Sequence, residues 1–238
     1  MSESLYIETL VRVPMNEIWR LTQDPDQHQR WDLRFGSISA LTGSAGGCRG
    51  FRYALTVWPG RVISGEGVTV SERWRSDGSC TSVLRFSSQD PLSLVSEGVG
   101  FWRYLPTAGG IRFLTRYRYE PRWGRLGRQV DRVFRPLLGW ATAWSFDRLR
   151  LWVERGVGPR RGLFHGLAEV VARVSVVAGV VAVGPAGWAG PSLVAVVLMA
   201  AVLAPPTPYT PAARRCLRRP PDVVAARPPA TASLLEEW

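Results

Sequence analysis

The chain has 238 residues, of which 46% are hydrophobic and 21% are charged. This composition excludes a collagen-like chain, a disulfide-rich scaffold and a wholly disordered protein, and the length fits one ordinary domain with an additional segment. The 30 basic residues are all arginine, and with 19 acidic residues they give a net charge of +11. Cys48, Cys80 and Cys216 lie far apart and form no CxxC motif, so we expect neither a structural zinc site nor a disulfide framework.

The first two thirds of the chain carry the pattern of an α+β domain. Residues 5–13 are rich in β-branched and aromatic side chains, which predicts a strand. Pro14 can open a short helix, and a second short helix or turn is expected at residues 24–31. Consecutive strands joined by tight turns predict an antiparallel meander. These six further strands are expected at residues 34–41, 48–58, 61–75, 79–88, 93–105 and 111–122.

A long helix is predicted over residues 126–155. Apolar side chains recur there at spacings of three and four: Val130, Val133, Phe134, Leu137, Trp140, Ala141, Trp144, Leu151 and Trp152. Such spacing places these side chains on one face of a helix. We therefore expect this apolar stripe to cover the sheet.

This order of elements resembles the helix-grip fold of the START-like (SRPBCC) superfamily, in particular its polyketide cyclase/dehydrase-type branch. The resemblance is carried by the strand, proline and helix of Ile7–Trp19, by Trp31 after the second short helix, and by the terminal helix with Trp140 and Trp152. It implies an α+β fold in which a curved antiparallel sheet of about seven strands wraps around the long helix, with two short helices after strand 1 and two apolar helices at the end. It also implies a deep apolar cavity between sheet and helix.

Alternation within the strands identifies side chains for the wall of such a cavity, because successive side chains point to opposite faces. In residues 111–122 the aromatic side chains share one face and the arginines share the other. In residues 61–75 Glu66 shares the phase of the valines, which predicts a carboxylate at the cavity wall. The set expected to line a ligand cavity is Phe51, Tyr53, Glu66, Trp102, Phe113, Tyr117, Tyr119 and Trp144.

The last third of the chain is apolar and then rich in proline. Residues 158–204 contain two apolar runs around a Gly/Pro turn and are expected to form a two-helix transmembrane hairpin that follows the domain at 1–157. Arginines flank both ends of the hairpin, which favours a location at the cell membrane with the soluble domain and both termini cytoplasmic. Glu169 and Arg173 can pair on one helix face near the interface. Residues 205–238 are expected to form a flexible tail.

Sequence motifs for nucleophilic, nucleotide-dependent or metal-dependent catalysis do not occur in the chain, so we predict no catalytic residue, no metal and no cofactor. His28 lies in a polar stretch and is expected to be a solvated loop residue. The aromatic and arginine faces of the strands are opposite, whereas single-strand binders combine both on one surface, so we expect no nucleic-acid partner.

We therefore predict membrane-tethered binding of a hydrophobic small molecule or lipid in the cavity, at the cytoplasmic face. The alternative is a polyketide cyclase/dehydrase-like enzyme that uses the same cavity, with Glu66 as a possible base. A third possibility is an adaptor whose cavity is filled by its own side chains. The sequence leaves the ligand and the oligomeric state open.

Overall fold

The computed structural model describes residues 4–41, 49–58, 60–183 and 189–232. Several sequence expectations fall outside the described residues: the turns at 43–47 and 184–188, Cys48, Pro59 and the last six residues of the expected tail.

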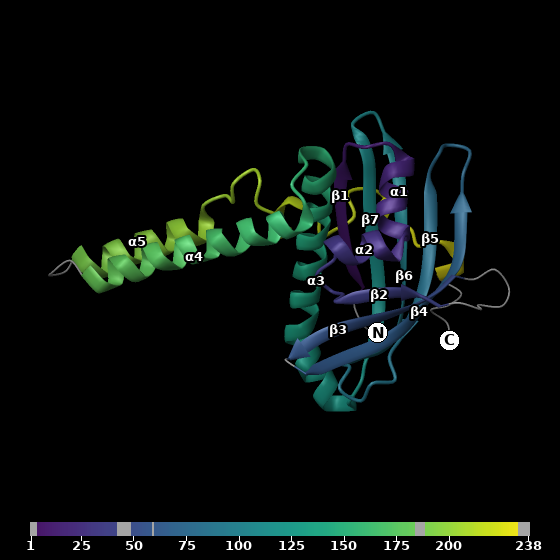
Figure 1. Cartoon of the computed structure of the whole chain (residues 1–238), viewed down its shortest axis with the longest axis horizontal. Coiled ribbons are helices and arrows are strands. Elements are labelled where there is room, and N and C mark those ends of the chain that lie inside the picture. The colour runs from purple at the N-terminus through teal and green to yellow at the C-terminus, as the bar shows by residue number, and fades with distance from the viewer. Residues whose placement is uncertain (1–3, 42–48, 59, 184–188, 233–238) are drawn as a thin grey trace.

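One antiparallel sheet and one long helix form the body of the molecule (Figure 1). The sheet has seven strands in the order β1-β7-β6-β5-β4-β3-β2, and two short helices follow β1. The predicted α+β class and the predicted element order are therefore confirmed. The elements are β1 (Leu5–Val11), α1 (Met15–Gln23), α2 (Pro25–Trp31), β2 (Ser37–Ala40), β3 (Arg49–Trp58), β4 (Arg61–Trp74), β5 (Cys80–Ser87), β6 (Val95–Thr107), β7 (Gly110–Pro121) and α3 (Gly124–Arg155).

Aromatic rings form the core where α3 crosses β6 and β7. Phe113 of β7 stacks on Phe146 of α3 with ring centroids 4.5 Å apart, and on Tyr104 of β6 at 5.1 Å. Trp31 from the end of α2 meets Phe146 edge to face and is fully buried. These contacts hold one end of the helix tightly against the sheet.

Only part of the apolar stripe predicted for α3 faces the sheet. Val133 and Leu137 of that stripe are 65% and 58% accessible to solvent, whereas Phe134 of the same stripe lies inside, with its ring centroid 6.2 Å from that of Tyr119. The buried positions include Asp131 and Thr142, which hydrogen-bond to tyrosines of β7. These polar side chains face inward because they have partners there, and the apolar side chains on the opposite side of the helix consequently face outward.

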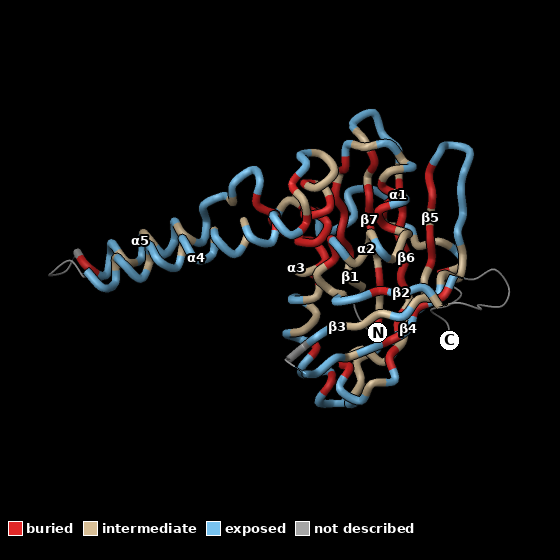
Figure 2. Tube along the Cα trace, in the orientation of Figure 1, coloured by how far each residue is buried: buried red, intermediate tan, exposed pale blue. Residues whose placement is uncertain are grey.

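Two apolar helices, α4 (Pro159–Val183) and α5 (Ala189–Leu203), form an arm that projects from the end of α3 (Figure 1). Figure 2 shows the arm exposed along almost its whole length. Among the described residues α4 alone is long and apolar enough to cross a membrane, and α5 is a shorter apolar helix. None of the residues in the most apolar stretch of α4 is buried, whereas the core helix of a globular protein is mostly buried.

The segment after the arm returns to the domain, which differs from the flexible tail expected for residues 205–238. It contains a 3-10 turn at Ala213–Arg215 and a short helix, α6, at Val223–Ala226. Its described part, up to residue 232, includes the buried residues Ala225 and Ala232, which pack on the outer side of β1, β6 and β7.

Specific bonds fix this return segment. The backbones of Glu8 and Leu217 exchange hydrogen bonds of 3.0 and 2.9 Å, so the segment forms an isolated antiparallel β-bridge with β1. Arg215 forms an ion pair of 2.9 Å with the buried Asp147 of α3, and Cys216 lies in the aromatic core cluster. Composition predicts disorder here because it does not reveal these pairings across the chain.

Candidate functional site

A cavity of about 1010 Å³ lies between the curved sheet, the two short helices and the N-terminal half of α3. Its wall is mostly apolar and comes from β2 to β7 and from all three helices of the domain. Five of the eight residues expected to line it do so: Phe51, Tyr53, Trp102, Tyr117 and Tyr119. A volume of this size matches ligand pockets in general, which span roughly 300–1,000 Å³.

Two glycines of β4 make room for the aromatic wall of β3. Tyr53 is paired with Gly65 and Phe51 with Gly67 in the antiparallel register. A Cβ atom at Gly65 would lie 2.3 Å from the Tyr53 hydroxyl, and one at Gly67 would lie 2.2 Å from the Phe51 ring. Both rings therefore lie across the backbone of β4, and burial raises the pKa of Tyr53 to about 12.

The expectation that Glu66 lies at the cavity wall is corrected by the same register. The inward phase of β4 belongs to the glycines and to Ile63 and Thr69, both of which line the cavity. Glu66 points to the outer face, where it accepts a 2.8 Å hydrogen bond from Arg52 and is about half exposed. The valine pattern was misleading because glycine occupies the buried positions.

Phe113 and Trp144 are buried outside the cavity lining. Phe113 is fully enclosed in the ring stack of the core. Trp144 lies on the arm side of α3, where its indole contacts Gly166 of α4 and approaches Trp140 at 6.4 Å. Both residues therefore have packing roles beside the cavity.

Hydroxyl groups of β7 are bonded to α3 across the cavity. The Tyr117 and Thr142 hydroxyls lie 2.9 Å apart, and Tyr119 donates to Asp131 at 2.5 Å. Asp131 also pairs with Arg135 at 2.7 Å. Burial raises the pKa of both tyrosines, and for Tyr119 the bond to Asp131 adds to the rise. Both phenols are consequently neutral, polar groups on an otherwise apolar wall.

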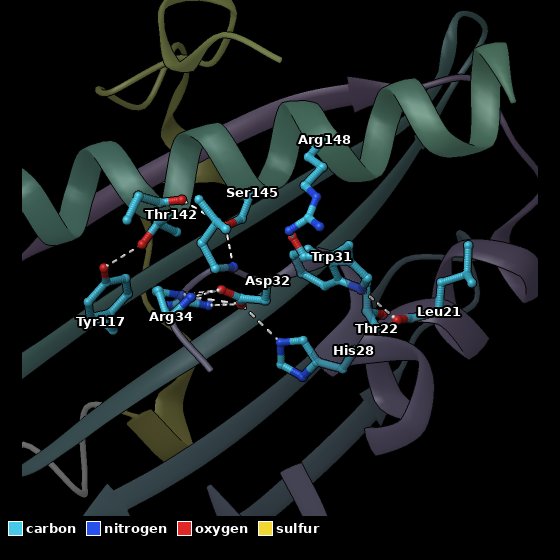
Figure 3. A network of polar contacts seen from close by, with 12 residues as sticks. Leu21, Thr22, His28, Trp31, Asp32, Arg34, Tyr117, Thr142, Ser145 and Arg148 are labelled. Atoms are coloured by element: carbon cyan, nitrogen blue, oxygen red, sulfur yellow. Dashed lines mark hydrogen bonds and ion pairs between the residues drawn. The ribbon is translucent and has the colours of Figure 1, made fainter. Parts of the chain in front are cut away.

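His28 is a cavity residue, although its polar sequence neighbours predict a solvated loop. It lies in α2, its side chain is only 12% exposed, and it lines the cavity. Its ring stacks on Trp31 and meets the edge of Trp102, with both centroid distances at 4.9 Å. Nε2 lies 3.0 Å from Asp32 Oδ2 (Figure 3). The spacing of four between His28 and Asp32 was the available signal, because such residues are neighbours on a helix.

Asp32 holds this polar group together from a fully buried position. It accepts hydrogen bonds of 2.9 and 2.6 Å from the Arg34 guanidinium and one of 3.0 Å from the Arg34 backbone (Figure 3). Burial by itself would raise the pKa of Asp32, but the charge of Arg34 and the bonds from His28 and Arg34 hold it well below its usual range. Burial lowers the pKa of His28, although Asp32 opposes the shift.

The short loop after α2 is anchored to α3. The Leu33 backbone donates to the Ser145 hydroxyl at 2.9 Å, and Arg148 donates to the Trp31 carbonyl at 3.3 Å (Figure 3). These bonds hold Asp32 between the helix and the cavity wall. The imidazole, whose pKa burial lowers, is rigidly held and backed by a carboxylate, an arrangement that can hydrogen-bond a ligand or accept its proton.

Metal binding has no evident location in the part of the chain that the structure describes, where no three His, Cys, Asp or Glu side chains gather suitably. The cavity instead offers mostly apolar walls with a few polar groups among them, such as His28 and Tyr117. Such a site suits a mostly apolar molecule that carries a hydrogen-bonding group.

Comparison with known proteins gives a membrane-protein relative and structures of similar fold. No family model matches the chain. The uncharacterized membrane protein YndG of Bacillus subtilis is 43% identical over 159 residues, which cover 66% of this chain and 59% of that protein. The chain therefore matches less than two thirds of this relative's length.

Among solved structures, similar chains include the di-domain aromatase/cyclase StfQ from the steffimycin biosynthetic pathway (TM-score 0.48, 14% identity, 62% of this chain and 48% of that chain). They also include the aromatase/cyclase Zhui from Streptomyces sp. R1128 (TM-score 0.43, 13% identity, 63% of this chain and 97% of that chain). A third is a fragment of the STAR-related lipid transfer protein of Xanthomonas axonopodis (TM-score 0.41, 15% identity, 50% of this chain and 69% of that chain).

Proposed function

We propose that this chain is a START-like, membrane-tethered binding protein whose cavity holds a lipid or another largely apolar small molecule. The observation that carries the proposal is the combination of a cavity of about 1010 Å³ with an exposed apolar arm on the same chain. The relationship to a membrane protein supports the tether.

The arm supports membrane insertion through its exposure and length. Apolar side chains along α4 and α5, such as Val171 and Met199, are more than half exposed, which a protein in water rarely tolerates over so long a surface. With 25 residues α4 is about 37 Å long at 1.5 Å per residue, enough for a hydrocarbon core of ~30 Å. With 15 residues α5 reaches about 22 Å.

The two ends of the arm favour one side of the membrane. Arg148 of α3 bonds to the Pro159 carbonyl at the start of α4, and Arg215 holds the segment after α5 to Asp147. Both ends of the arm are thus attached to the same domain. Arg173 pairs with Glu169 and donates to the Ala204 carbonyl at 3.0 Å, which lowers the cost of placing this charge near lipid. We assign the domain and its flanking arginines to the cytoplasmic face.

Native mass spectrometry of the full chain extracted in detergent tests the binding proposal. Wild type should carry a co-purifying small molecule, and Ile63→Trp should lose it, because Ile63 lines the cavity and an indole would fill it. The control is Val62→Trp on the same strand, since Val62 is 51% exposed on the outer face. Equal occupancy in both variants, or a wild type without any bound molecule, would contradict a ligand cavity.

An acid–base enzyme of the cyclase/dehydrase type is the second candidate, and the His28–Asp32 pair favours it. The test follows the co-purified molecule over time by liquid chromatography and mass spectrometry in the presence of wild type or His28→Gln. An enzyme should convert the molecule, and the variant should be slower by about 10²- to 10⁴-fold, the usual contribution of a general base. A binding protein should leave the molecule unchanged in both samples.

A further inference from the structure

Five apolar residues of α3 form a stripe that the described part of the chain leaves largely exposed. It consists of Leu126, Val130, Val133, Leu137 and Trp140, which are between 39% and 65% exposed. Five large apolar side chains in line on one helix face form a patch of the kind that marks an interaction surface. Because the inward face of the same helix carries Asp131 and Thr142, rotation of the helix cannot bury the stripe without breaking the bonds to β7.

The stripe leads directly to the base of the arm. The next position in its spacing is Trp144, whose indole packs against α4. A Cβ atom added at Gly166 of α4 would lie only 3.1 Å from this indole. Trp140 lies beside it, with ring centroids 6.4 Å apart. The stripe therefore faces the side of α3 from which the arm projects, and Figure 2 shows exposed turns of α3 on that side.

The two edges of the stripe differ in chemistry. On one edge Val130 and the neighbouring Phe134 and Leu138 line the cavity, so the cavity wall reaches the surface at the stripe. Trp123, at the start of the helix, also lines the cavity and is 41% exposed.

Arginines occupy the opposite edge. Arg125, Arg128 and Arg132 are exposed, and within the part of the chain that the structure describes their side chains take part in none of the ion pairs or hydrogen bonds observed. An apolar helix face flanked by arginine is typical of helices that lie in the interface of an anionic membrane.

We propose that this stripe lies on the surface of the anionic bilayer that holds the arm, so that the cavity opens toward the lipid and takes its ligand from it. The inference rests on the proposed tether and goes beyond it by naming a second contact and a route into the cavity. Anionic headgroups complement the three arginines, and the acyl region complements the stripe.

A second copy of the chain is the competing occupant, because the stripe spacing of four and three also fits a coiled coil. The stripe spans only about two heptads, and Pro136 lies within it, whereas sustained coiled coils need at least about three to four heptads. The bilayer is therefore the occupant we propose.

The test uses the full chain with a single fluorescent probe and vesicles of phosphatidylcholine with phosphatidylglycerol. The probe is attached to a cysteine replacing Leu137, or in the control to one replacing Ser76, which lies in the exposed turn between β4 and β5 away from the arm (Figure 1). Cys48 is replaced by serine in both, and the buried Cys80 and Cys216 are kept. Vesicles should shield the Leu137 probe from an aqueous quencher and leave the Ser76 probe accessible.

Charge variants probe the headgroup contact. Each of Arg125→Gln, Arg128→Gln and Arg132→Gln should lower the ratio of shielded to accessible probe by about fivefold, from the usual strength of one arginine at an anionic surface. Arg73→Gln, on an exposed part of β4, is the matched control and should have no effect.

Vesicle flotation separates the two proposals. A chain that fails to float with vesicles refutes the tether itself. A chain that floats while the Leu137 probe stays as accessible as the Ser76 probe overturns the docking proposal and leaves the tether standing. Shielding that rises with protein concentration in detergent, without vesicles, assigns the stripe to a second copy of the chain and also overturns the proposal.

Discussion

Replacing Asp32 with Asn should destabilise the protein more than any other isosteric change in the cavity region. The Asp32 side chain is fully buried and receives bonds from Arg34 at 2.6 and 2.9 Å and from His28 at 3.0 Å. The variant keeps the shape of the side chain and removes its charge, which leaves the Arg34 guanidinium buried without a counterion. Loss of one partner of a buried pair typically costs about 3–5 kcal/mol.

The assay is urea unfolding of the full chain in detergent micelles, followed by tryptophan fluorescence at pH 7. Asp26→Asn is the control, because Asp26 lies in the adjoining helix α2 and is exposed. The double variant Asp32→Asn/Arg34→Gln should recover part of the loss, since removal of both partners leaves no unpaired charge. This account of the network would be refuted if Asp32→Asn lowered the free energy of unfolding by less than about 1 kcal/mol and the double variant showed no recovery.

The pH dependence gives a second measure of the same effect. Because the pKa of Asp32 is held below its usual range, its stabilising contribution is complete above about pH 3.9, the usual value for aspartate. It is lost as the pH falls through the lowered value. The Asn variant should lack this acid-dependent loss.

His28→Gln should remove the loss of stability that wild type shows below about pH 6.5, because burial lowers the pKa of His28 and the unfolded chain takes up the proton first. The same pH dependence of the urea midpoint in wild type and variant would contradict this. Tyr117→Phe removes the bond to Thr142 and should cost at most about 1 kcal/mol, yet lower ligand occupancy in native mass spectrometry; unaltered occupancy would count against a ligand role. A chain ending at residue 157 should lose cooperative unfolding, because it lacks Cys216 and the pairing with β1; cooperative unfolding like that of the full chain would disprove this.

Most strands could be predicted because their turns are marked in the sequence. Pro59-Gly60 and Gly109-Gly110 separate runs rich in β-branched and aromatic residues, and the predicted limits of β3, β4 and β7 agree with the structure to within one or two residues. Such turns are local features, so a single sequence contains the information. The return segment pairs residues more than 200 positions apart, such as Glu8 and Leu217, and no local signal marks that pairing.

The side chains of the site were harder to predict than the strands. Tyr53, Tyr117 and Tyr119 follow simple alternation and line the cavity as expected. Glu66 was misplaced because buried glycines carry no apolar signal of their own. His28 was missed because its neighbours in sequence are polar, whereas its neighbours in space are Trp31 and Trp102.

The long helix shows most clearly why pattern and burial can disagree. A helix normally buries its apolar stripe, but here Tyr119 and Tyr117 draw Asp131 and Thr142 to the sheet side through hydrogen bonds. The stripe is left outside, on the same side as an arm that is itself apolar and exposed. Because the described part of the chain does not cover this apolar stripe, we infer that a surface outside the protein covers it. One bilayer surface would cover both the arm and the stripe, and would lie beside the cavity wall formed by Val130 and Phe134.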